Sequence, residues 1–269
     1  MRLTVLGSGT LLPDPQHTSP AHWLELGEDT APVRMLLDCG AGALHGMGRE
    51  RLAWRSLSHL VLTHFHTDHV GDLAALFWAL RHGVRPERTE EPLVLLGPRG
   101  LRAHLDALAG AHGRHMVDPG FPLEVAELRD GDLYADAADR FTLRVRRTPH
   151  TDASIAVRVD TADGSVGYTG DTGPSEPLGP FFHGVGALVA ECSLADPPSL
   201  ATHLSPTSLA ALASAARPGL LVVTHLYPPL RPHQIPELVR AAGYEGEVLV
   251  ANDGTTLEIG RGGARLVSG

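Results

Sequence analysis

The sequence of 269 residues has only two cysteines, Cys39 and Cys192, and few aromatic residues, which make up 5% of it. Two cysteines in a chain of this length do not indicate a disulfide framework. No apolar run reaches the length of a membrane span, and the first ten residues, MRLTVLGSGT, lack the apolar core of a secretory signal. These absences predict a cytoplasmic protein without a membrane partner.

The sequence also lacks a surplus of basic residues. It has 22 Lys and Arg residues against 31 Asp and Glu residues, and its formal net charge is -9. Broad electrostatic binding of nucleic acid depends on clustered Lys and Arg, so this acidic balance argues mildly against it. A local basic patch is still compatible with the composition, and Arg144, Arg146 and Arg147 are the residues that would form it.

Short apolar runs, rich in leucine and β-branched residues, recur along the chain, and Gly, Pro and Asp separate them. This pattern is typical of strands bounded by turns. Strands are expected at residues 3–6, 33–37, 57–63, 93–96, 141–145, 155–159, 165–168, 187–190, 220–223 and 248–250.

Four other segments carry apolar residues at the period of a helix, and they span residues 68–82, 99–111, 205–216 and 236–242. The third begins with Ser205 before Pro206, which is a helix-start signal. Because strands dominate both halves and helices lie between them, we expect an α/β fold. Two sheets would pack face to face, with helices covering the outsides. No repeat or linker is evident, so one domain over residues 1–269 is predicted.

The segment Thr63-His64-Phe65-His66-Thr67-Asp68-His69 follows one of these apolar runs directly. Imidazole nitrogen and carboxylate oxygen are ligands that zinc-like ions prefer. A strand leading into a tight turn would point His64 and His66 one way and Asp68 and His69 another, which can hold two metals side by side. The chain has 16 histidines, but the H-x-H-x-D-H spacing after a strand is far more specific than abundance. We predict a metal site here.

Further polar residues stand at the ends of later apolar runs. His150 lies in Thr148-Pro149-His150-Thr151, Asp171 follows Gly170, and His225 follows Thr224. Each lies where an expected strand gives way to a loop, and sites on sheet scaffolds are built at such places.

Together, these motifs resemble the metallo-β-lactamase-fold hydrolases over the span from Gly7 to Asn252. The resemblance implies a four-layer αββα sandwich of two mixed sheets with outer helices. It also implies two divalent metal ions, with Zn²⁺ favoured, although Mn²⁺ or Fe²⁺ accept the same ligands. By the resemblance, His64, His66 and His150 would hold the first metal, Asp68, His69 and His225 the second, and Asp171 would bridge both.

Finer motifs are similar to the ribonuclease Z and cyclic-phosphodiesterase branch. They are Gly7-Ser8-Gly9-Thr10, Leu37-Asp38-Cys39-Gly40, Tyr168-Thr169-Gly170-Asp171-Thr172 and His203-Leu204-Ser205. In that branch a histidine at the position of His203 contacts the scissile phosphate, so His203 is expected to stabilise charge in the transition state. Asp68 is expected to orient the attacking water or accept its proton, besides binding metal. The branch often forms pairs, so a homodimer is expected by analogy.

One departure from ribonuclease Z bears on the substrate. That family usually inserts a long arm that grips tRNA between the third metal histidine and the bridging aspartate. Here only one expected strand pair separates His150 from Asp171. The sequence therefore favours a metal-dependent phosphodiesterase acting on a small or cyclic phosphodiester, such as a cyclic nucleotide or a cyclic ribose phosphate.

Three alternatives remain. The first is a tRNA 3′-processing endonuclease of the ribonuclease Z type, with tRNA as partner. The second is a thioester, lactone or β-lactam hydrolase on the same metal site. The third is a binding protein that keeps the fold without the chemistry, although all seven candidate ligands are present.

Positions around the site are less specific. Asp38, Thr63 and Thr224 are candidates to orient the imidazoles from behind, and each also fits a structural role at a strand end. His17, in the loop after the Gly7–Thr10 turn, is a candidate to border the pocket. The turn itself fits either a tight backbone turn or a contact to phosphate.

Overall fold

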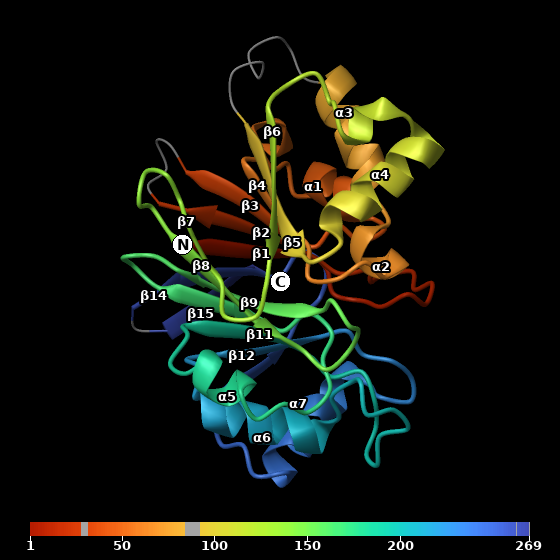
Figure 1. The fold of residues 1–269 in the computed structure, drawn as a ribbon. Helices are drawn as coiled ribbons and strands as arrows, with labels where there is room; N and C mark the ends of the chain where they lie inside the picture. The colour runs from red at the N-terminus through yellow and green to blue at the C-terminus, as the bar shows by residue number, and fades with distance from the viewer. Residues whose placement is uncertain (28–31, 84–91, 262, 269) are drawn as a thin grey trace.

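The computed structural model describes residues 1–27, 32–83, 92–261 and 263–268. Within them, two mixed sheets face each other (Figure 1). The first sheet has the strand order β15 (Gly263–Ser268), β14 (Thr256–Gly260), β1 (Arg2–Gly7), β2 (Ala21–Leu26), β3 (Val33–Leu37), β4 (His59–Val61), β5 (Leu93–Pro98), β6 (Leu123–Leu128). The second has the order β13 (Val248–Val250), β12 (Leu221–Thr224), β11 (Ala187–Glu191), β10 (Ser165–Tyr168), β9 (Ile155–Asp160), β8 (Thr142–Arg147), β7 (Leu133–Ala135).

Helices cover the outer face of each sheet (Figure 1). On the first sheet these are α1 (Ala43–Arg49), α3 (Leu73–Gly83) and α4 (Leu101–His112), and the short α2 (Thr67–Val70) precedes α3. On the second sheet they are α5 (Leu178–Phe181), α6 (Pro206–Ala216) and α7 (Ile235–Ala241). Single 3₁₀ turns occur at Trp54–Ser56, Arg114–Met116 and Pro232–Gln234. The fold is therefore the four-layer αββα sandwich that was predicted.

The apolar runs of the sequence are continuous because the central strands are buried on both faces. In β3, Met35 and Leu37 point into the core between the sheets, whereas Leu36 packs under the helices. In β12, Val222 faces the other sheet and Val223 faces the helices. Each strand thus adds side chains to two hydrophobic layers, which fixes its register in the sandwich.

The structure corrects two expected elements. The strand expected at residues 57–63 is limited to β4, and the helix expected at residues 68–82 is two helices separated at Gly71 and Asp72. The Asp72 carboxylate accepts bonds from the backbone N–H groups of Gly42 and Leu44, both at 3.0 Å. A Cβ atom at Gly71 would lie 2.8 Å from the Thr67 carbonyl oxygen. Local packing against the α1 loop therefore breaks a pattern that looks like one continuous helix.

The apolar patterns of the sequence did not predict seven further elements. These are β2, β6, β7, β14 and β15, together with α1 and α5. Among the missed strands, β6, β7 and β15 are edge or near-edge strands with exposed or half-buried side chains, so their apolar signal is weak. One domain over residues 1–269 stays a prediction, and the core that the two sheets share supports it. No helix in the described part of the chain is long and apolar enough to cross a membrane.

Candidate metal centre

Four strand ends meet at one end of the sandwich. The segments after β4, β8, β10 and β12 carry His64, His150, Asp171 and His225 respectively. Backbone hydrogen bonds tie these segments across the two sheets: Ile155 N–H donates to the Thr63 carbonyl at 3.0 Å, and His225 N–H donates to the Ser8 carbonyl at 2.8 Å. The ligand candidates thus come from both sheets, and loops fixed by backbone bonds carry them.

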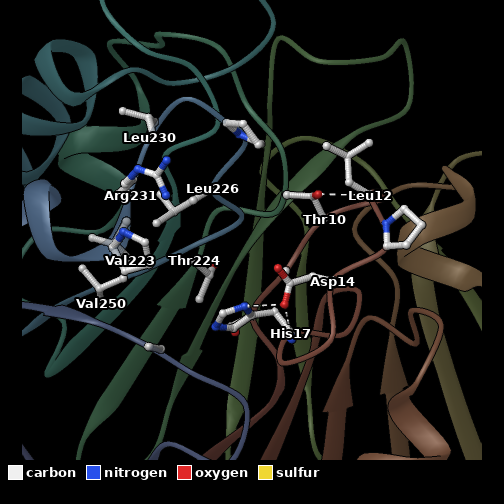
Figure 2. Close-up of a pocket in the computed structure, with 16 residues that line it drawn as sticks. Thr10, Leu12, Asp14, His17, Val223, Thr224, Leu226, Leu230, Arg231 and Val250 are labelled. Carbon is white, nitrogen blue, oxygen red and sulfur yellow. Dashed lines mark hydrogen bonds and ion pairs between the residues drawn. The ribbon is translucent and has the colours of Figure 1, made fainter.

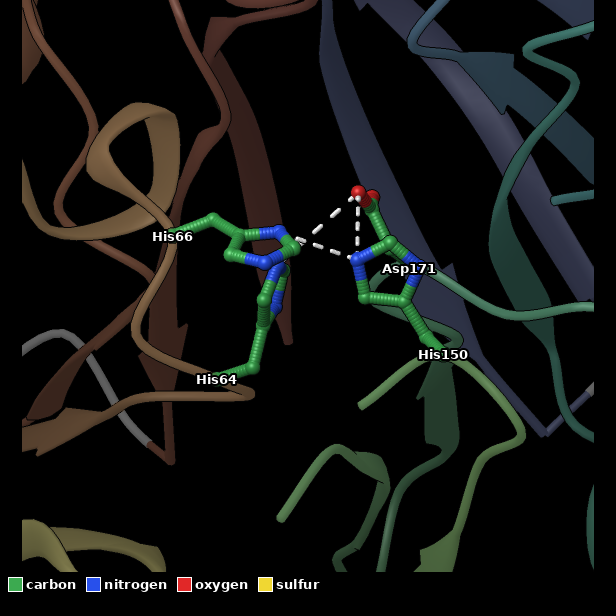
Figure 3. A group of neighbouring side chains, drawn as sticks. All are labelled: His64, His66, His150 and Asp171. Carbon is green, nitrogen blue, oxygen red and sulfur yellow. Dashed lines mark hydrogen bonds and ion pairs between the residues drawn. The ribbon is translucent and has the colours of Figure 1, made fainter. Parts of the chain in front are cut away.

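The first group of side chains consists of His64, His66, His150 and Asp171, whose ligand atoms all lie within 4.8 Å of one another (Figure 3). His66 Nδ1 is 3.0 Å from His150 Nε2. Asp171 Oδ2 lies 3.6 Å from His150 Nε2 and 3.9 Å from His64 Nε2. Three imidazoles and one carboxylate oxygen therefore converge on one point.

The second group consists of Asp68, His69 and His225, again with ligand atoms within 4.8 Å of one another. Asp68 Oδ2 is 3.4 Å from His225 Nε2 and 3.9 Å from His69 Nε2. The other oxygen of Asp171, Oδ1, faces this group, at 3.3 Å from His69 Nε2 and 3.7 Å from His225 Nε2. Asp171 thus directs one carboxylate oxygen to each group.

The imidazoles are oriented as metal ligands require. His69 Nδ1 is 2.7 Å from Asp38 Oδ2, and His225 Nδ1 is 2.8 Å from Ser193 Oγ. His64 Nδ1 is 3.1 Å from Thr63 Oγ1. His150 Nδ1 is 3.0 Å from the Thr202 carbonyl oxygen. A proton on each Nδ1 leaves the Nε2 lone pair facing inward.

Two buried nitrogen atoms support this fit directly. Nε2 of His64 and Nε2 of His69 are buried and have no hydrogen-bond partner among the residues that the structure describes. A buried polar atom without a partner is costly, and a divalent cation satisfies such a nitrogen. The residues present therefore fit divalent metal ions, and their nitrogen and oxygen donors match the preference of zinc.

The Asp38 carboxylate organises the second group from behind. It accepts hydrogen bonds from the Thr63 backbone and hydroxyl, at 2.7 and 2.8 Å, from the Tyr168 hydroxyl at 2.8 Å and from His69 Nδ1. Asp38 is fully buried and has a φ of 57°, a conformation that L-residues rarely adopt. The strand end is thus held in a strained conformation that aims this carboxylate at His69.

Electrostatics favour a charged Asp171 carboxylate and neutral imidazoles at His64 and His150. Burial raises the pKa of the Asp171 carboxyl, but the imidazoles of His225 and His69 more than offset this and hold the pKa well below its usual range. Burial lowers the pKa of His64 well below its ordinary value, and burial also lowers the pKa of His150. Neutral imidazole and ionised carboxylate are the forms that bind metal.

His203 lies beside both groups, and Glu191 holds it. A nitrogen of His203 is within 4.8 Å of ligand atoms of Asp171 and His225. His203 Nδ1 is 2.9 Å from Glu191 Oε1. Burial lowers the pKa of His203, but the hydrogen bond and negative charge of Glu191 raise it by more, so the pKa lies above its ordinary value. This imidazole is therefore a fixed hydrogen-bond donor at the edge of the centre.

Glu191 is the main residue that the sequence analysis missed. It ends β11 and is buried, and its carboxylate also accepts backbone bonds from Thr172 at 2.7 Å, Ser193 at 3.1 Å and Leu204 at 3.2 Å. A charged residue at the end of a fully apolar run was the available signal. Ser193 and the Thr202 carbonyl were missed too, because loop residues give no local sign of which histidine they reach.

The other sequence candidates have mixed outcomes. Asp38 and Thr63 do contact imidazoles of the centre, whereas no hydrogen bond among the described residues joins the Thr224 side chain to them. Arg144 is 2.8 Å from Asp160, and Arg146 is 3.5 Å from Asp130, so acids neutralise two of the three arginines of the basic stretch.

The turn at residues 7–10 is tightly packed. A Cβ atom at Gly7 would lie 1.9 Å from the Ser19 carbonyl oxygen, so glycine is required there for the close approach of two backbones. The Asp253 carboxylate holds the turn by accepting bonds from the backbone and hydroxyl of Ser8, both at 2.8 Å.

Comparison with known proteins now identifies the family. A family model described as a β-lactamase superfamily domain matches residues 33–226. The protein belongs to the metallo-β-lactamase superfamily. A ribonuclease Z of Mycobacterium sp. (strain KMS) is 33% identical to it over 258 residues, which cover 87% of each chain. As a superfamily member with such relatives, the protein is a metal-dependent hydrolase.

Solved structures of this superfamily share the fold. YhfI from Bacillus subtilis, a metallo-β-lactamase fold protein, superposes with a TM-score of 0.79 at 22% identity, covering 95% of this chain and 98% of YhfI. The short form of human tRNase Z superposes with a TM-score of 0.75 at 21% identity, covering 96% and 99%. At these identities the likeness establishes the fold alone.

Proposed function

We propose that this hydrolase is a dinuclear metal phosphodiesterase that cleaves a small or cyclic phosphodiester, such as a cyclic nucleotide or a cyclic ribose phosphate. The proposal rests on the orientation of the Asp171 carboxylate, whose two oxygens face different ligand groups. Oδ2 faces the first group, and Oδ1 faces the second. One carboxylate shared between two ligand groups is suited to two metal ions side by side.

The chain's own residues supply positioning and proton handling. The two groups would hold two divalent ions, which would supply a lowered pKa for bound water and neutralisation of charge on a phosphate oxygen. Asp68 holds Oδ2 at the inner edge of the second group, where it orients the attacking water or accepts its proton. His203 donates a hydrogen bond to a phosphoryl oxygen, and Glu191 keeps its ring in place.

His203 also distinguishes phosphoryl from acyl substrates. A phosphodiester shares its negative charge between two non-bridging oxygens, so a donor beside two cations has a second charged oxygen to bind. The Glu191–His203 pair therefore favours a phosphodiester over a thioester or lactone. Thioester, lactone or β-lactam hydrolysis on the same ligands is the outcome to exclude.

The absence of an arm supports a small substrate. Between His150 and Asp171 the chain forms only the hairpin of β9 and β10, joined by residues 161–164. Nothing in that stretch extends away from the sandwich to hold a large RNA. The paired arginines Arg144 and Arg146 add no free basic surface beside it.

A second candidate function is tRNA 3′-end processing. It is favoured by the relatives at 33% identity, which carry the name ribonuclease Z and match this chain over most of their length. In this case surfaces other than an arm would hold the tRNA. The chemistry at the metal centre would be the same, and the substrate would differ.

The metal-loaded enzyme is tested first with bis-p-nitrophenyl phosphate. We expect hydrolysis that a chelator abolishes and that Zn²⁺ restores, with Mn²⁺ and Fe²⁺ compared in parallel, and metal analysis giving two ions per chain. Absence of diesterase activity in a folded, metal-loaded protein that cleaves thioesters or lactones would overturn the proposal. A panel of 2′,3′-cyclic nucleotides, 3′,5′-cyclic nucleotides and a precursor tRNA then separates the two phosphodiester candidates.

The role of His203 is tested by substitution. In His203→Ala, kcat for the diester is expected to fall by about 10²- to 10³-fold, as for loss of one transition-state donor, while both metal ions are retained. In Glu191→Gln the ring loses its anionic partner, so a smaller loss of kcat is expected. Full activity of His203→Ala with both metals bound would remove the assigned role.

A further inference from the structure

A pocket of about 290 Å³ lies between the loop after β1 and the loop after β12 (Figure 2). Its floor is formed by the ends of β12 and β13, including Thr224 and Val250. One wall is the loop after β1, which carries Leu12, and the opposite wall is the loop after β12, which carries Leu230. We call this cavity the side pocket.

The side pocket and the metal centre share a wall. Thr224 lines the pocket, and the next residue, His225, belongs to the second ligand group. The Tyr227 ring packs edge-on against the His225 ring, with centroids 5.5 Å apart. Thr10 lines the pocket from the other side. The pocket therefore adjoins the second ligand group.

The lining combines apolar walls with one unpaired cation. Leu12, Leu226 and Leu230 present aliphatic surface, and Arg231 lies on the same side as Leu226 and Leu230 in Figure 2. The exposed guanidinium of Arg231 has no hydrogen bond or ion pair within the described ranges. Such a lining suits an organic group that packs on aliphatic side chains and carries an anion at one end.

The acid in the pocket lining does not neutralise Arg231. Asp14 Oδ1 accepts bonds from the backbone of Gln16 at 2.8 Å and His17 at 2.9 Å, and from His17 Nδ1 at 2.9 Å. His17 Nε2 in turn lies 3.2 Å from Asn252 Oδ1. The carboxylate is thus committed to its own loop, and it holds His17 at the wall of the side pocket.

Both walls are ordered before any ligand binds. The Asp253 carboxylate holds Ser8 and Thr18 together by bonds of 2.8 Å to each backbone N–H. The loop after His225 contains Pro228, Pro229 and Pro232, which restrict its backbone. A pocket with preformed walls loses little conformational entropy on binding.

We infer that the side pocket binds the nucleoside arm of the substrate, with Arg231 on a second phosphate group beyond the one that is cleaved. This inference rests on the proposed function and narrows it to a nucleotide with at least two phosphate groups. The volume is at the low end of small-molecule sites, about 300–1,000 Å³. It therefore accommodates one nucleoside and not a helical segment of RNA.

The test uses three probes as inhibitors of bis-p-nitrophenyl phosphate hydrolysis by the metal-loaded enzyme. They are inorganic phosphate, adenosine 5′-monophosphate and adenosine 3′,5′-bisphosphate. The inhibition constant is expected to fall in that order, with the bisphosphate about tenfold tighter than the monophosphate because of the additional Arg231 contact. Calorimetric titration of the same probes measures binding without turnover.

Two variants separate the parts of the pocket. Arg231→Gln is expected to remove the advantage of the bisphosphate over the monophosphate. Leu12→Asp, at an exposed position, is expected to bring the monophosphate down to the affinity of phosphate. Arg240→Gln, an exposed position in α7, makes the same charge change outside the pocket and should leave all three constants unchanged.

Equal binding of monophosphate and bisphosphate by the native enzyme, or an unchanged ratio in Arg231→Gln, overturns the inference. Chelator-sensitive diesterase activity in the same experiment would leave the proposed function standing. If diesterase activity is absent, the proposed function fails, and calorimetry still decides whether the bisphosphate binds through Arg231.

Discussion

The two ligand groups of the centre differ in burial and support. Asp68, His69 and His225 are all buried, whereas in the first group His66 is exposed and His150 is half-buried. Buried side chains hold the two imidazoles of the second group from behind. The first group relies on a hydroxyl and a backbone carbonyl, and within the described residues the His66 ring has no such outer partner. The second group is therefore the more rigidly held of the two, and the first is the more open to solvent.

The largest effect is expected at Asp171, because its carboxylate belongs to both groups. Asp171→Ala removes an oxygen from each group, so we expect both ions to be lost or weakly bound. Diesterase activity should fall by about 10³-fold or more, because the lost Lewis acids supply several kcal/mol. Metal analysis and kcat/KM measure this. If the variant keeps two tightly bound ions, the carboxylate is not shared as the geometry indicates.

The next effect separates the groups. Removing the imidazole in His69→Ala leaves the buried Asp38 carboxylate without one of its donors. The metal-free protein should lose about 1–3 kcal/mol of unfolding free energy. The matched change His66→Ala, at an exposed ring, should alter that free energy by less than about 0.5 kcal/mol. Denaturant unfolding of both apo-variants measures the difference. Equal losses would contradict the distinction between a rigid and an open group.

A smaller effect is expected from the residue behind the second group. Asp38→Asn keeps the shape but weakens the anionic partner of His69 Nδ1, so the affinity of the second-group ion should fall about 10- to 100-fold. The first-group ion should change much less. Competition with a chromogenic chelator resolves the two affinities, and Asp106→Asn, at an exposed position of α4, is the control. A uniform weakening of both ions would show that Asp38 does not act on one group selectively.

The smallest effect on the centre is expected at the opposite end of β8. Asp136 pairs with Arg140 at 2.8 Å, and this hydrogen bond is the main reason that its pKa is lowered to about 2. Because the folded pKa lies below the unfolded value, the carboxylate stabilises the protein above about pH 4, and this contribution disappears as the pH falls through 2.

Asp136→Asn should therefore destabilise the protein at pH 7 by about 1 kcal/mol, after allowance for the exposed Arg140 partner. The difference from the native protein should vanish near pH 2. Metal content and kcat should not change. Unfolding curves at several pH values test this, and a change in either ligand group would show that the two ends of the sandwich are coupled.

How much the sequence predicted depended on the range of each interaction. The H-x-H-x-D-H segment predicted that His64 and His66 point one way and Asp68 and His69 another, and the ligand atoms divide in that way. A strand followed by a turn fixes such directions within six residues. The short apolar runs predicted the central strands, because these strands are apolar on both faces. The edge strands β6, β7 and β15 and the break at Gly71 and Asp72 were not predicted, because they depend on neighbours far along the chain.

The same limit applied to the site. His203 was found through its motif, but its partner Glu191 was not, since no local pattern connects the end of β11 to a histidine twelve residues later. Thr224 was a reasonable guess for the residue behind His225, yet the structure places Ser193 there. The side pocket was not predicted from the sequence, since Arg231 and the leucines of its walls come from loops far apart in the chain.

The sequence by itself determined the chemistry available: imidazoles and carboxylates at strand ends, with no framework of thiols and no basic surplus. Only the tertiary structure decided how that chemistry is divided. It brings His225 to within 3.4 Å of Asp68 across 157 residues and Tyr168 to Asp38 across 130 residues, and it sets the two Asp171 oxygens toward different groups. Ligand type is a property of single residues, whereas the distances between ligands depend on how two sheets pack.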